Sequence, residues 1–403
     1  MTLGTPIILL LLSGIVILSY IFNLVSKKTN IPSVLMLIAT GIAIKHTTVY
    51  YWAIQADVMK LVKVLGAVGL IMIVLEAALD LKVNRTKLKL IGDSFFSALF
   101  IFLISAFGIA YVVMQWLDVP FEKSFLYAVP LSIISSAIVI PSTSHLVEEK
   151  KEFIIYESSF SDILGILVFN YMIMENVMSL KALGSFSFNV GLGLLLSVVA
   201  TIVLVYVVAA IRINLKFFLI FAVLSFLYAL GEMIHLPALL IVLVFGLVIN
   251  NTPLIIRGKV EKYVNRESID SILDFMKSIT AETSFLIRTF FFILFGYTIN
   301  LDVLILPEVW QIGTVIILLL LSVRYFYLRI ILKTNLLPEL FLMPRGLVTI
   351  LLFYSIPTQK SIGSFNEGIL FFVVAVSSIL MMIGLMFFSK GEIGYQEKSE
   401  EAI

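Results

Sequence analysis

Apolar segments close to the length that crosses a bilayer follow one another along almost the whole chain. A transmembrane helix needs about 20 consecutive apolar residues, and roughly thirteen segments approach this length. Of the 403 residues, 61% are hydrophobic and 13% are charged, whereas a soluble domain carries about 25% charged residues. We therefore predict an all-α polytopic membrane protein, not a soluble protein with a single anchor.

The predicted helices are numbered along the chain. They cover residues 6–25, 32–45, 62–81, 90–117, 124–146, 153–176, 189–211, 216–234, 237–250, 279–300, 312–331, 337–356 and 368–389. The second, ninth and twelfth are short and could be re-entrant, so a count of about twelve spans is the main alternative. Residues 390–403 form a short charged tail.

Lysine and arginine gather in alternate loops, which predicts the orientation because such loops stay in the cytoplasm. The rich loops lie around residues 27–28, 82–89, 150–151, 212–216, 257–266 and 329–333. We therefore expect a multi-pass cell-membrane protein with its N-terminus outside and its C-terminus in the cytoplasm. That all these loops fall on one side also supports the odd number of helices.

The second and ninth predicted helices share one pattern of residues. The shared residues recur at identical spacing: Pro32, Leu35, Gly41 and Ile44 in one helix, and Pro237, Leu240, Gly246 and Ile249 in the other. The fifth and twelfth helices also correspond, because each carries an internal proline, Pro141 and Pro344. Equivalent helices are seven apart in this count, so the two halves have opposite orientations.

Inverted repeats with helices interrupted at corresponding positions are typical of secondary transporters with a binding site at the membrane midplane. We therefore predict one transporter domain over residues 1–389. It contains a first repeat (1–178), a linker helix (179–212) and a second repeat (213–389), and the tail of 390–403 follows it.

Ionisable residues occur inside several of the apolar segments. Such a residue at the bilayer centre costs roughly 2.5–3.5 kcal/mol on insertion scales, so it usually has a function. Asp162 lies in the sixth predicted helix, and Glu76, Arg324 and Arg345 lie in other apolar segments. This set indicates an ion or proton pathway. Arg288 either snorkels to the interface or pairs with an acid.

Oxygen-bearing side chains gather around Asp162. Ser158 lies four residues earlier, on the same helix face, and Ser161 adds a hydroxyl on a neighbouring face. Small hard cations take oxygen ligands, so this set can bind one. Glu157 is turned about 140° away, at ~100° per residue, and needs its own partner. The alternative is that Asp162 only forms a salt bridge with an arginine.

Polar residues also surround the prolines of the fifth and twelfth helices. Ser135 and Ser136 precede Pro141, and Pro344 precedes Arg345. A proline removes one backbone donor and frees a carbonyl, and nearby hydroxyls can satisfy the loosened turn. Arg345 could balance the negative carbonyl ends of two crossed half-helices. The alternative is an ordinary proline kink.

Four short runs resemble motifs of a known superfamily. Glu157-Ser-Ser-Phe-Ser-Asp162 resembles the Glu-Ser-x-x-Asn-Asp motif of sodium/proton exchangers in the cation–proton antiporter superfamily. Ser135-Ser-Ala-Ile-Val-Ile-Pro141 is similar to the Ser-Ser-Thr-Ala run of its potassium-efflux branch. Pro344-Arg345-Gly346 resembles the Arg-Gly motif of the twelfth helix, and Leu75-Glu76 resembles the acidic motif of the third.

The resemblance implies the sodium/proton antiporter fold, with two inverted repeats and crossed broken helices, and a homodimer. It implies that Asp162 takes either the transported metal ion, Na⁺ or K⁺, or a proton. It makes Ser158 and Glu76 candidate cation ligands.

The resemblance also implies structural roles and shows two departures. Glu157 would pair with Arg324 as a structural bridge, and Arg345 would hold the crossed helices. Ser161 stands where sodium/proton exchangers have Asn and the electrogenic branch has a second Asp. The fifth helix also lacks the usual Thr-Asp-Pro, which leaves the choice between Na⁺ and K⁺ open.

We therefore predict a secondary antiporter that exchanges a monovalent cation for protons. Burial disfavours the charged form of a carboxylate, so Asp162 can hold a proton or a cation but not both. With one such acid, exchange is one-to-one and electroneutral. We expect the lipid bilayer as surroundings, no cofactor besides the transported ions and no nucleic-acid partner.

Three rival functions remain at this stage. A sodium-coupled solute symporter or a channel-like protein could use the same broken-helix scaffold. A membrane enzyme such as a lipid acyltransferase needs a catalytic histidine or a metal cluster, and no His-x-x-x-Asp run or histidine-rich helix is present. We therefore expect no enzyme. A transport-inactive sensor is the third rival, and the intact Asp162 argues against it.

Overall fold

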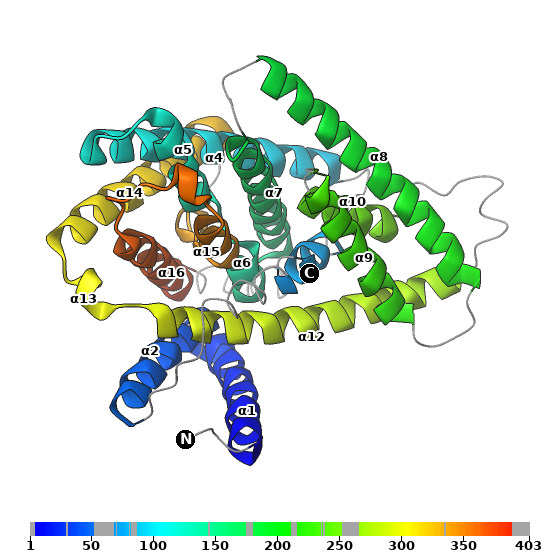
Figure 1. The fold of residues 1–403 in the computed structure, drawn as a ribbon, viewed down its shortest axis with the longest axis horizontal. Coiled ribbons are helices and arrows are strands. Elements are labelled where there is room, and N and C mark those ends of the chain that lie inside the picture. The colour runs from blue at the N-terminus through cyan, green and yellow to red at the C-terminus, as the bar shows by residue number, and fades with distance from the viewer. Residues whose placement is uncertain are drawn as a thin grey trace, which may run out of the picture. The chain divides into compact units, whose positions relative to one another are not determined.

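The computed structural model describes residues 5–29, 31–51, 68–69, 71–79, 81, 87–143, 146–174, 180–210, 216–234, 236, 238–251, 266–333 and 336–388. Within these ranges the chain is almost entirely helical and has no strand (Figure 1). Among these described residues, seven helical segments are long and apolar enough to cross a membrane, counting residues 121–142 as one segment, and three shorter helices are also apolar. The prediction of an all-α polytopic protein is confirmed.

The chain clusters into two compact units. The first comprises residues 1–65, 90–165 and 288–403, and the second comprises residues 66–89 and 166–287. These units are defined by contacts and do not coincide with the predicted repeats. The repeats at 1–178 and 213–389 therefore stay a prediction.

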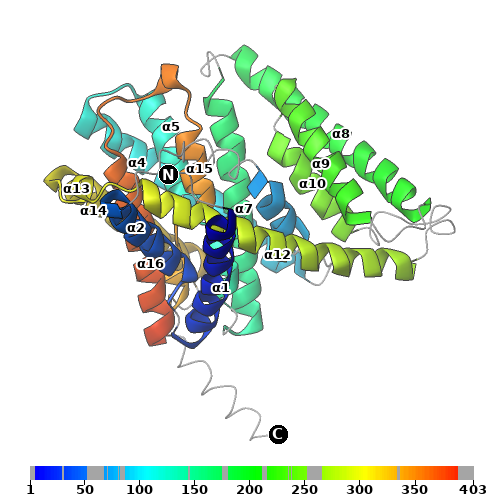
Figure 2. The ribbon, with the colours of Figure 1, turned by 60° about the horizontal axis from the view of Figure 1, so that its bottom comes forward.

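The first unit begins with α1 (Thr5–Thr29) and α2 (Ser33–Tyr51), which lie side by side (Figure 2). It continues with α4 (Leu88–Leu117) from Leu90 on, α5 (Phe121–Ser132), α6 (Ser136–Ser142) and α7 (Glu148–Met172) as far as Gly165. Its last part contains the end of α12 (Arg266–Thr298), α13 (Leu301–Leu304), α14 (Pro307–Phe326), a π-helical turn (Tyr327–Leu332), α15 (Leu347–Tyr354) and α16 (Glu367–Phe388). Single 3₁₀ turns occupy Glu339–Phe341 and Thr358–Lys360.

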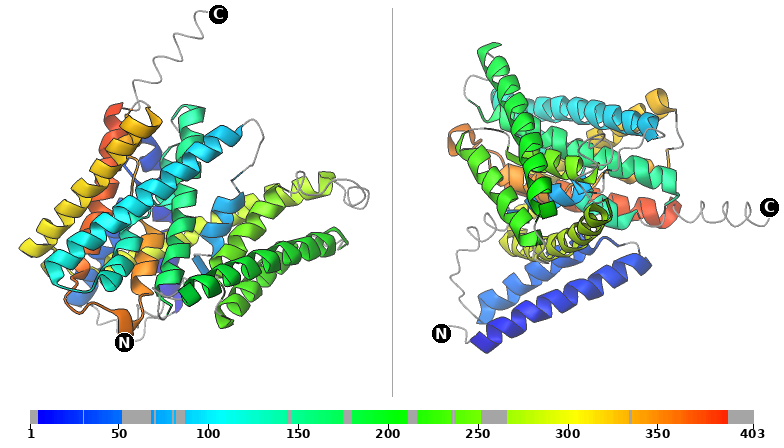
Figure 3. Two further views of the ribbon diagram at one scale, coloured as in Figure 1. Left: turned by 90° about the horizontal axis from the view of Figure 1, so that it is seen from above. Right: turned by 90° about the vertical axis from the view of Figure 1, so that its right-hand side faces the viewer.

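The second unit is built around α8 (Leu180–Ala210), α9 (Lys216–Met233) and α10 (Ala238–Asn250). The short α10 packs against both of the longer helices (Figure 3). Leu227, Leu236 and Ile241 form its buried apolar cluster. Ser197 of α8 donates a hydrogen bond to the carbonyl of Ile241 at 2.7 Å, so α8 and α10 are joined by a polar contact as well.

The fifth predicted helix, residues 124–146, is two helices in the structure. α5 ends at Ser132 and α6 begins at Ser136, so the prediction of one helix with its break at Pro141 is wrong. Pro141 lies inside α6. The break lies earlier because the backbone N–H groups at 134–136 have hydrogen-bond acceptors on other segments, which the next section describes.

The twelfth predicted helix, residues 337–356, is also interrupted. Residues 342–346 are not helical, and α15 begins only at Leu347. Pro344 lies in this interruption, as a proline disfavours helical backbone at the residue before it. The second predicted helix, residues 32–45, is longer than expected, because α2 continues to Tyr51.

Glycines bring two pairs of helices into close contact. In the first unit, a Cβ on Gly41 would lie 2.1 Å from a carbonyl oxygen of α12, and one on Gly296 would lie 2.2 Å from a carbonyl oxygen of α2. In the second unit, a Cβ on Gly246 of α10 would lie 2.5 Å from Ala78 in the helical residues 71–79. In the predicted repeat these two contacts are equivalent. The first joins the second and tenth predicted helices, and the second joins the ninth and third.

A buried ion pair joins α7 to α14. Arg324 donates from Nη2 to Glu157 Oε2 at 2.7 Å and from Nη1 to Oε1 at 3.1 Å, and both residues are fully buried. This bidentate geometry is typical of strong hydrogen bonding between a guanidinium and a carboxylate. Ser97 of α4 donates to Oε1 at 2.5 Å, and Arg324 Nε donates to the carbonyl of Glu339 at 2.7 Å.

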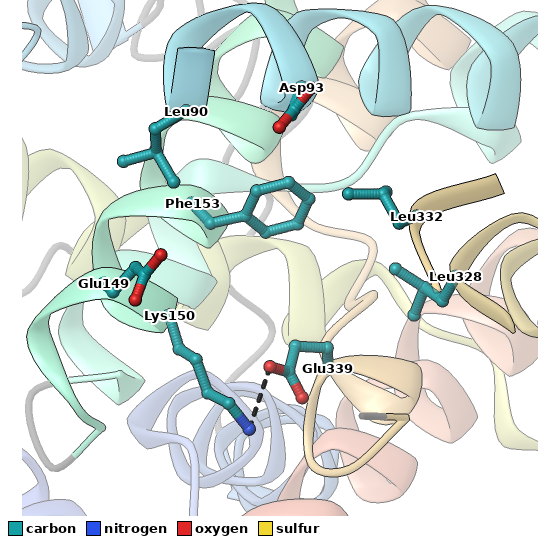
Figure 4. A pocket seen from close by; sticks show the side chains of 8 residues that line it. All are labelled: Leu90, Asp93, Glu149, Lys150, Phe153, Leu328, Leu332 and Glu339. Carbon is teal, nitrogen blue, oxygen red and sulfur yellow. Dashed lines mark ion pairs between the residues drawn. The ribbon is translucent and has the colours of Figure 1, made fainter. Parts of the chain in front are cut away.

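The turn that contacts Arg324 is held in its place by a second, more exposed ion pair. Lys150 Nζ lies 3.1 Å from Glu339 Oε1 and donates to the carbonyl of Leu337 at 3.1 Å. This pair borders a cavity of about 310 Å³ (Figure 4). The cavity is lined by Leu90, Asp93, Glu149, Lys150, Phe153, Leu328, Leu332 and Glu339.

The buried pair yields the first testable prediction. Arg324→Ala leaves Glu157 buried without its cation, which typically costs about 3–5 kcal/mol. The melting temperature in detergent should fall more than for Asp162→Asn, which keeps the side-chain shape. Lys151→Met is the control, because its ion pair with Glu148 at 3.4 Å is more exposed, and exposed pairs contribute about 0–1 kcal/mol. Wild-type melting of both Arg324→Ala and Glu157→Ala would contradict the structural role of the pair.

Candidate functional site

The interruption between α5 and α6 is stabilised by two other segments. The N–H of Ile134 donates to Ser161 Oγ of α7 at 2.9 Å. The N–H of Ser135 donates to the carbonyl of Pro344 at 2.9 Å. A buried N–H without an acceptor costs about as much as a lost hydrogen bond. The two interrupted segments, 133–135 and 342–346, are therefore joined directly through their backbones.

Gly346 allows these two segments to approach closely. A Cβ at this position would lie 2.5 Å from Ser135 Oγ and 2.7 Å from Ile138 Cδ1. Its φ of −152° is accessible to any residue, so lack of space is what requires glycine here. In the Arg-Gly pair of the sequence, Gly346 therefore allows the close approach of the two segments, and Arg345 has a different role.

Arg345 binds backbone carbonyls at the end of α5. Its Nε donates to Leu131 at 2.9 Å, and its Nη2 donates to Ser132 at 3.3 Å. Its Nη1 donates to Met343 at 2.5 Å. The carbonyl end of a helix carries partial negative charge, which this buried guanidinium balances. The N–H of Arg345 donates to Ser377 Oγ of α16 at 3.0 Å.

Asp162 lies on α7 beside the first turn of α6. Its Oδ2 accepts two hydrogen bonds from Ser136, one from the N–H at 3.2 Å and one from Oγ at 2.5 Å. Its Oδ1 is buried and accepts no hydrogen bond from the part of the chain that the structure describes. Buried polar atoms nearly always have partners. One carboxylate oxygen is thus held by Ser136, and the other has no donor among these residues.

The other predicted ligands differ in their surroundings. Ser158 is buried one turn before Asp162, and its hydroxyl donates to the carbonyl of Ile155 at 3.2 Å, so its lone pairs can still bind a ligand. Ser161 Oγ accepts the backbone hydrogen bond described above, which gives it a structural task. Glu76 lies in the helical residues 71–79 of the second unit, and its part in the site stays a prediction.

Two serines of α4 contact α7, although no sequence motif singles them out. Ser94 donates to the carbonyl of Phe153 at 3.2 Å, and Ser97 donates to Glu157. Residues three apart lie on one face of a helix. Serines at this spacing in an otherwise apolar helix are a signal that could indicate a polar contact with a neighbouring helix.

Comparisons with known proteins agree with these features. Residues 12–390 match the family model described as sodium/hydrogen exchanger, transmembrane. The fold is similar to the sodium proton antiporter MjNhaP1 from Methanocaldococcus jannaschii at pH 8, with a TM-score of 0.72 and 17% identity over 93% of this chain and 94% of that chain. A second structure of MjNhaP1, from electron microscopy, gives a TM-score of 0.69 and 16% identity over 96% of both chains.

A search of curated protein sequences gives no significant match. Identities of 16–17% show a common fold alone, and the family assignment rests on the family model. That model covers most of the chain. The protein therefore belongs to the sodium/hydrogen exchanger family, within the cation–proton antiporter superfamily.

Proposed function

We propose that this protein exchanges a monovalent cation, Na⁺ or K⁺, for protons by alternate occupancy of Asp162. The observation that carries the proposal is the state of its two carboxylate oxygens. Oδ2 accepts both donors of Ser136, whereas Oδ1 is buried without a hydrogen-bond donor from the described residues. Family membership supports cation–proton antiport in general, and the assignment to Asp162 rests on this geometry.

A single carboxylate is enough for exchange. A bare anion is costly to bury, so Asp162 is favoured with either a proton or a cation on Oδ1. The two ligands compete for the same oxygen and cannot bind together. If the transporter reorients only when this charge is neutralised, cation movement in one direction requires proton movement in the other. Such alternating access is typical of inverted-repeat transporters.

The neighbouring serines have different tasks in this proposal. Ser136 uses two donors on one oxygen and so fixes the plane of the Asp162 carboxylate. Ser158 lies on the same face of α7, one turn away, and supplies a hydroxyl oxygen of the kind that hard cations bind. We propose Ser158 and Glu76 as further cation ligands. Ser161 is the weaker candidate, because its hydroxyl already accepts the hydrogen bond from the N–H of Ile134.

Exchange should be electroneutral because Asp162 is the one acid of the proposed site whose occupant changes. Glu157 is neutralised by Arg324 at 2.7 Å, and Ser161 is a hydroxyl where the electrogenic branch has a second acid. Glu76, if it binds the cation, stays charged through the cycle. Only Asp162 then changes its occupant, one cation against one proton.

Further parts of the proposal rest on sequence. The loops rich in lysine and arginine support an external N-terminus and a cytoplasmic C-terminus in the cell membrane. The similarity of Ser135 to Pro141 with the potassium-efflux branch keeps K⁺ beside Na⁺ as a substrate. The homodimer rests on the family resemblance alone. A sodium-coupled symporter or a channel is the second candidate, and neither would release protons when a cation is added.

The central prediction concerns Asp162→Asn. The amide keeps the shape of the side chain but cannot carry the titratable charge, so cation-driven proton flux should be lost while the protein stays folded. The measurement is proton movement in proteoliposomes after addition of Na⁺, K⁺ and Li⁺ in turn. Asp93→Asn, the same change in a half-buried acid of α4, is the control and should keep the flux. Near-normal flux in Asp162→Asn would remove this residue from the mechanism.

The second prediction concerns the membrane potential. One charge that crosses 100 mV is worth about 2.3 kcal/mol, so an electrogenic cycle would respond strongly to an imposed potential. We expect the exchange rate in proteoliposomes to stay the same at zero and at imposed potentials of either sign. A clear rise of the rate with potential would show a second titrating group, and Glu76→Gln would be the first variant to examine.

A further inference from the structure

Pro141 deprives one carbonyl of α6 of its helical donor. In an α-helix each N–H donates to the carbonyl four residues earlier, and proline has no N–H. The carbonyl affected is that of Ala137, the second residue of α6. Arg288 of α12 donates from Nη1 to this oxygen at 3.3 Å. Arg288 thus supplies the hydrogen bond that the missing backbone N–H would otherwise donate.

We propose that Arg288 is a positioning residue for Asp162, which it affects through Ala137 and Ser136. Ala137 directly follows Ser136, whose N–H and hydroxyl hold Asp162 Oδ2. A displacement of Ala137 therefore moves both donors. This inference rests on the proposed function, because only there is Asp162 the cation-binding group.

The short helix α6 has few hydrogen bonds of its own to resist such a displacement. It has only seven residues, whereas isolated helices shorter than about 12–15 residues are marginal even in favourable sequences. The N–H groups of Ile138 and Val139 share one acceptor, the carbonyl of Ser135, at 3.3 and 3.1 Å. Its position therefore depends on contacts from α7, from residues 342–346 and from α12.

Hydrogen bonds with a charged donor are roughly twice as strong as neutral ones. Pro141 thereby exchanges a bond within α6 for a bond from a charged donor on another helix, at 3.3 Å. An alanine at position 141 would provide the N–H again, and Ala137 would no longer need Arg288. The side chain of Pro141 is exposed, so this replacement leaves no cavity in a packed core. The two residues can therefore be tested as a pair.

The experiment is a double-mutant cycle of Arg288→Met, Pro141→Ala and the double variant in proteoliposomes. The apparent KM for Na⁺ and the maximal rate of Na⁺-driven proton flux are measured for each. Loss of a charge-assisted hydrogen bond should raise KM roughly tenfold for Arg288→Met. With Pro141→Ala already present, the same substitution should raise it less than about threefold, because the two sites are coupled. Arg288→Lys, which can still donate, should restore part of the loss.

Arg329→Met, the same change in an exposed arginine of the π-helical turn, is the matched control and should behave as wild type. An equal loss for Arg288→Met with and without Pro141→Ala would overturn the proposal, as would no loss at all. If Arg288→Met fails to fold, its rescue by Pro141→Ala supports the proposal and a failure of that rescue contradicts it. Lack of exchange in the wild type would refute the proposed function, and the melting temperatures of the four proteins would then still test the hydrogen bond.

Discussion

The need of buried backbone groups for hydrogen-bond partners governs this structure more than any side chain does. In an apolar environment an interrupted helix is tolerated only where its freed N–H and C=O groups find partners inside the protein. Here the N–H groups after α5 are taken by Ser161, Pro344 and Asp162. The interruption therefore brings the acidic residue to the chain break. The site and the break are one arrangement, since neither is satisfied without the other.

Two fully buried arginines show two uses of the same cation. Arg324 faces a carboxylate, and the network around Glu157 also takes in Ser97, so charge is matched with charge. Arg345 instead faces carbonyl oxygens of α5 and of Met343, so a full charge is matched with partial charges. The first arrangement links two continuous helices, α7 and α14, and the second stabilises interrupted ones. Both arginines are out of reach of water, which makes their partners indispensable.

Sequence reasoning succeeded where the signal lies within one segment. Apolar length predicts the helices, and Pro344 predicts the interruption at 342–346. The spacing of Glu157 and Asp162 predicts that the two acids serve different partners, and the structure places Glu157 on Arg324 and Asp162 on Ser136.

It failed where the determinant is a contact between distant segments. The break at 133–135 follows Pro130, which is itself still helical, and precedes Pro141 by several residues, so neither proline marks its place. The acceptor of Arg288 is the backbone carbonyl of Ala137, which leaves no trace in the residue types around it.

Glu76 belongs to the other compact unit, so its predicted part in the site is not tested by the geometry of the first.

The double hydrogen bond from Ser136 to one oxygen of Asp162 has a consequence for the choice of ion. With Oδ2 engaged twice, a bound ion can meet the carboxylate only end-on, through Oδ1. Asp162 then cannot coordinate the ion in a bidentate manner, with both carboxylate oxygens. In the proposed site, discrimination by ionic radius then falls to the other proposed oxygen ligands, the hydroxyl of Ser158 and the carboxylate of Glu76. Under the proposed mechanism, a substitution among these ligands would then alter the preferred ion and leave the titratable acid in place.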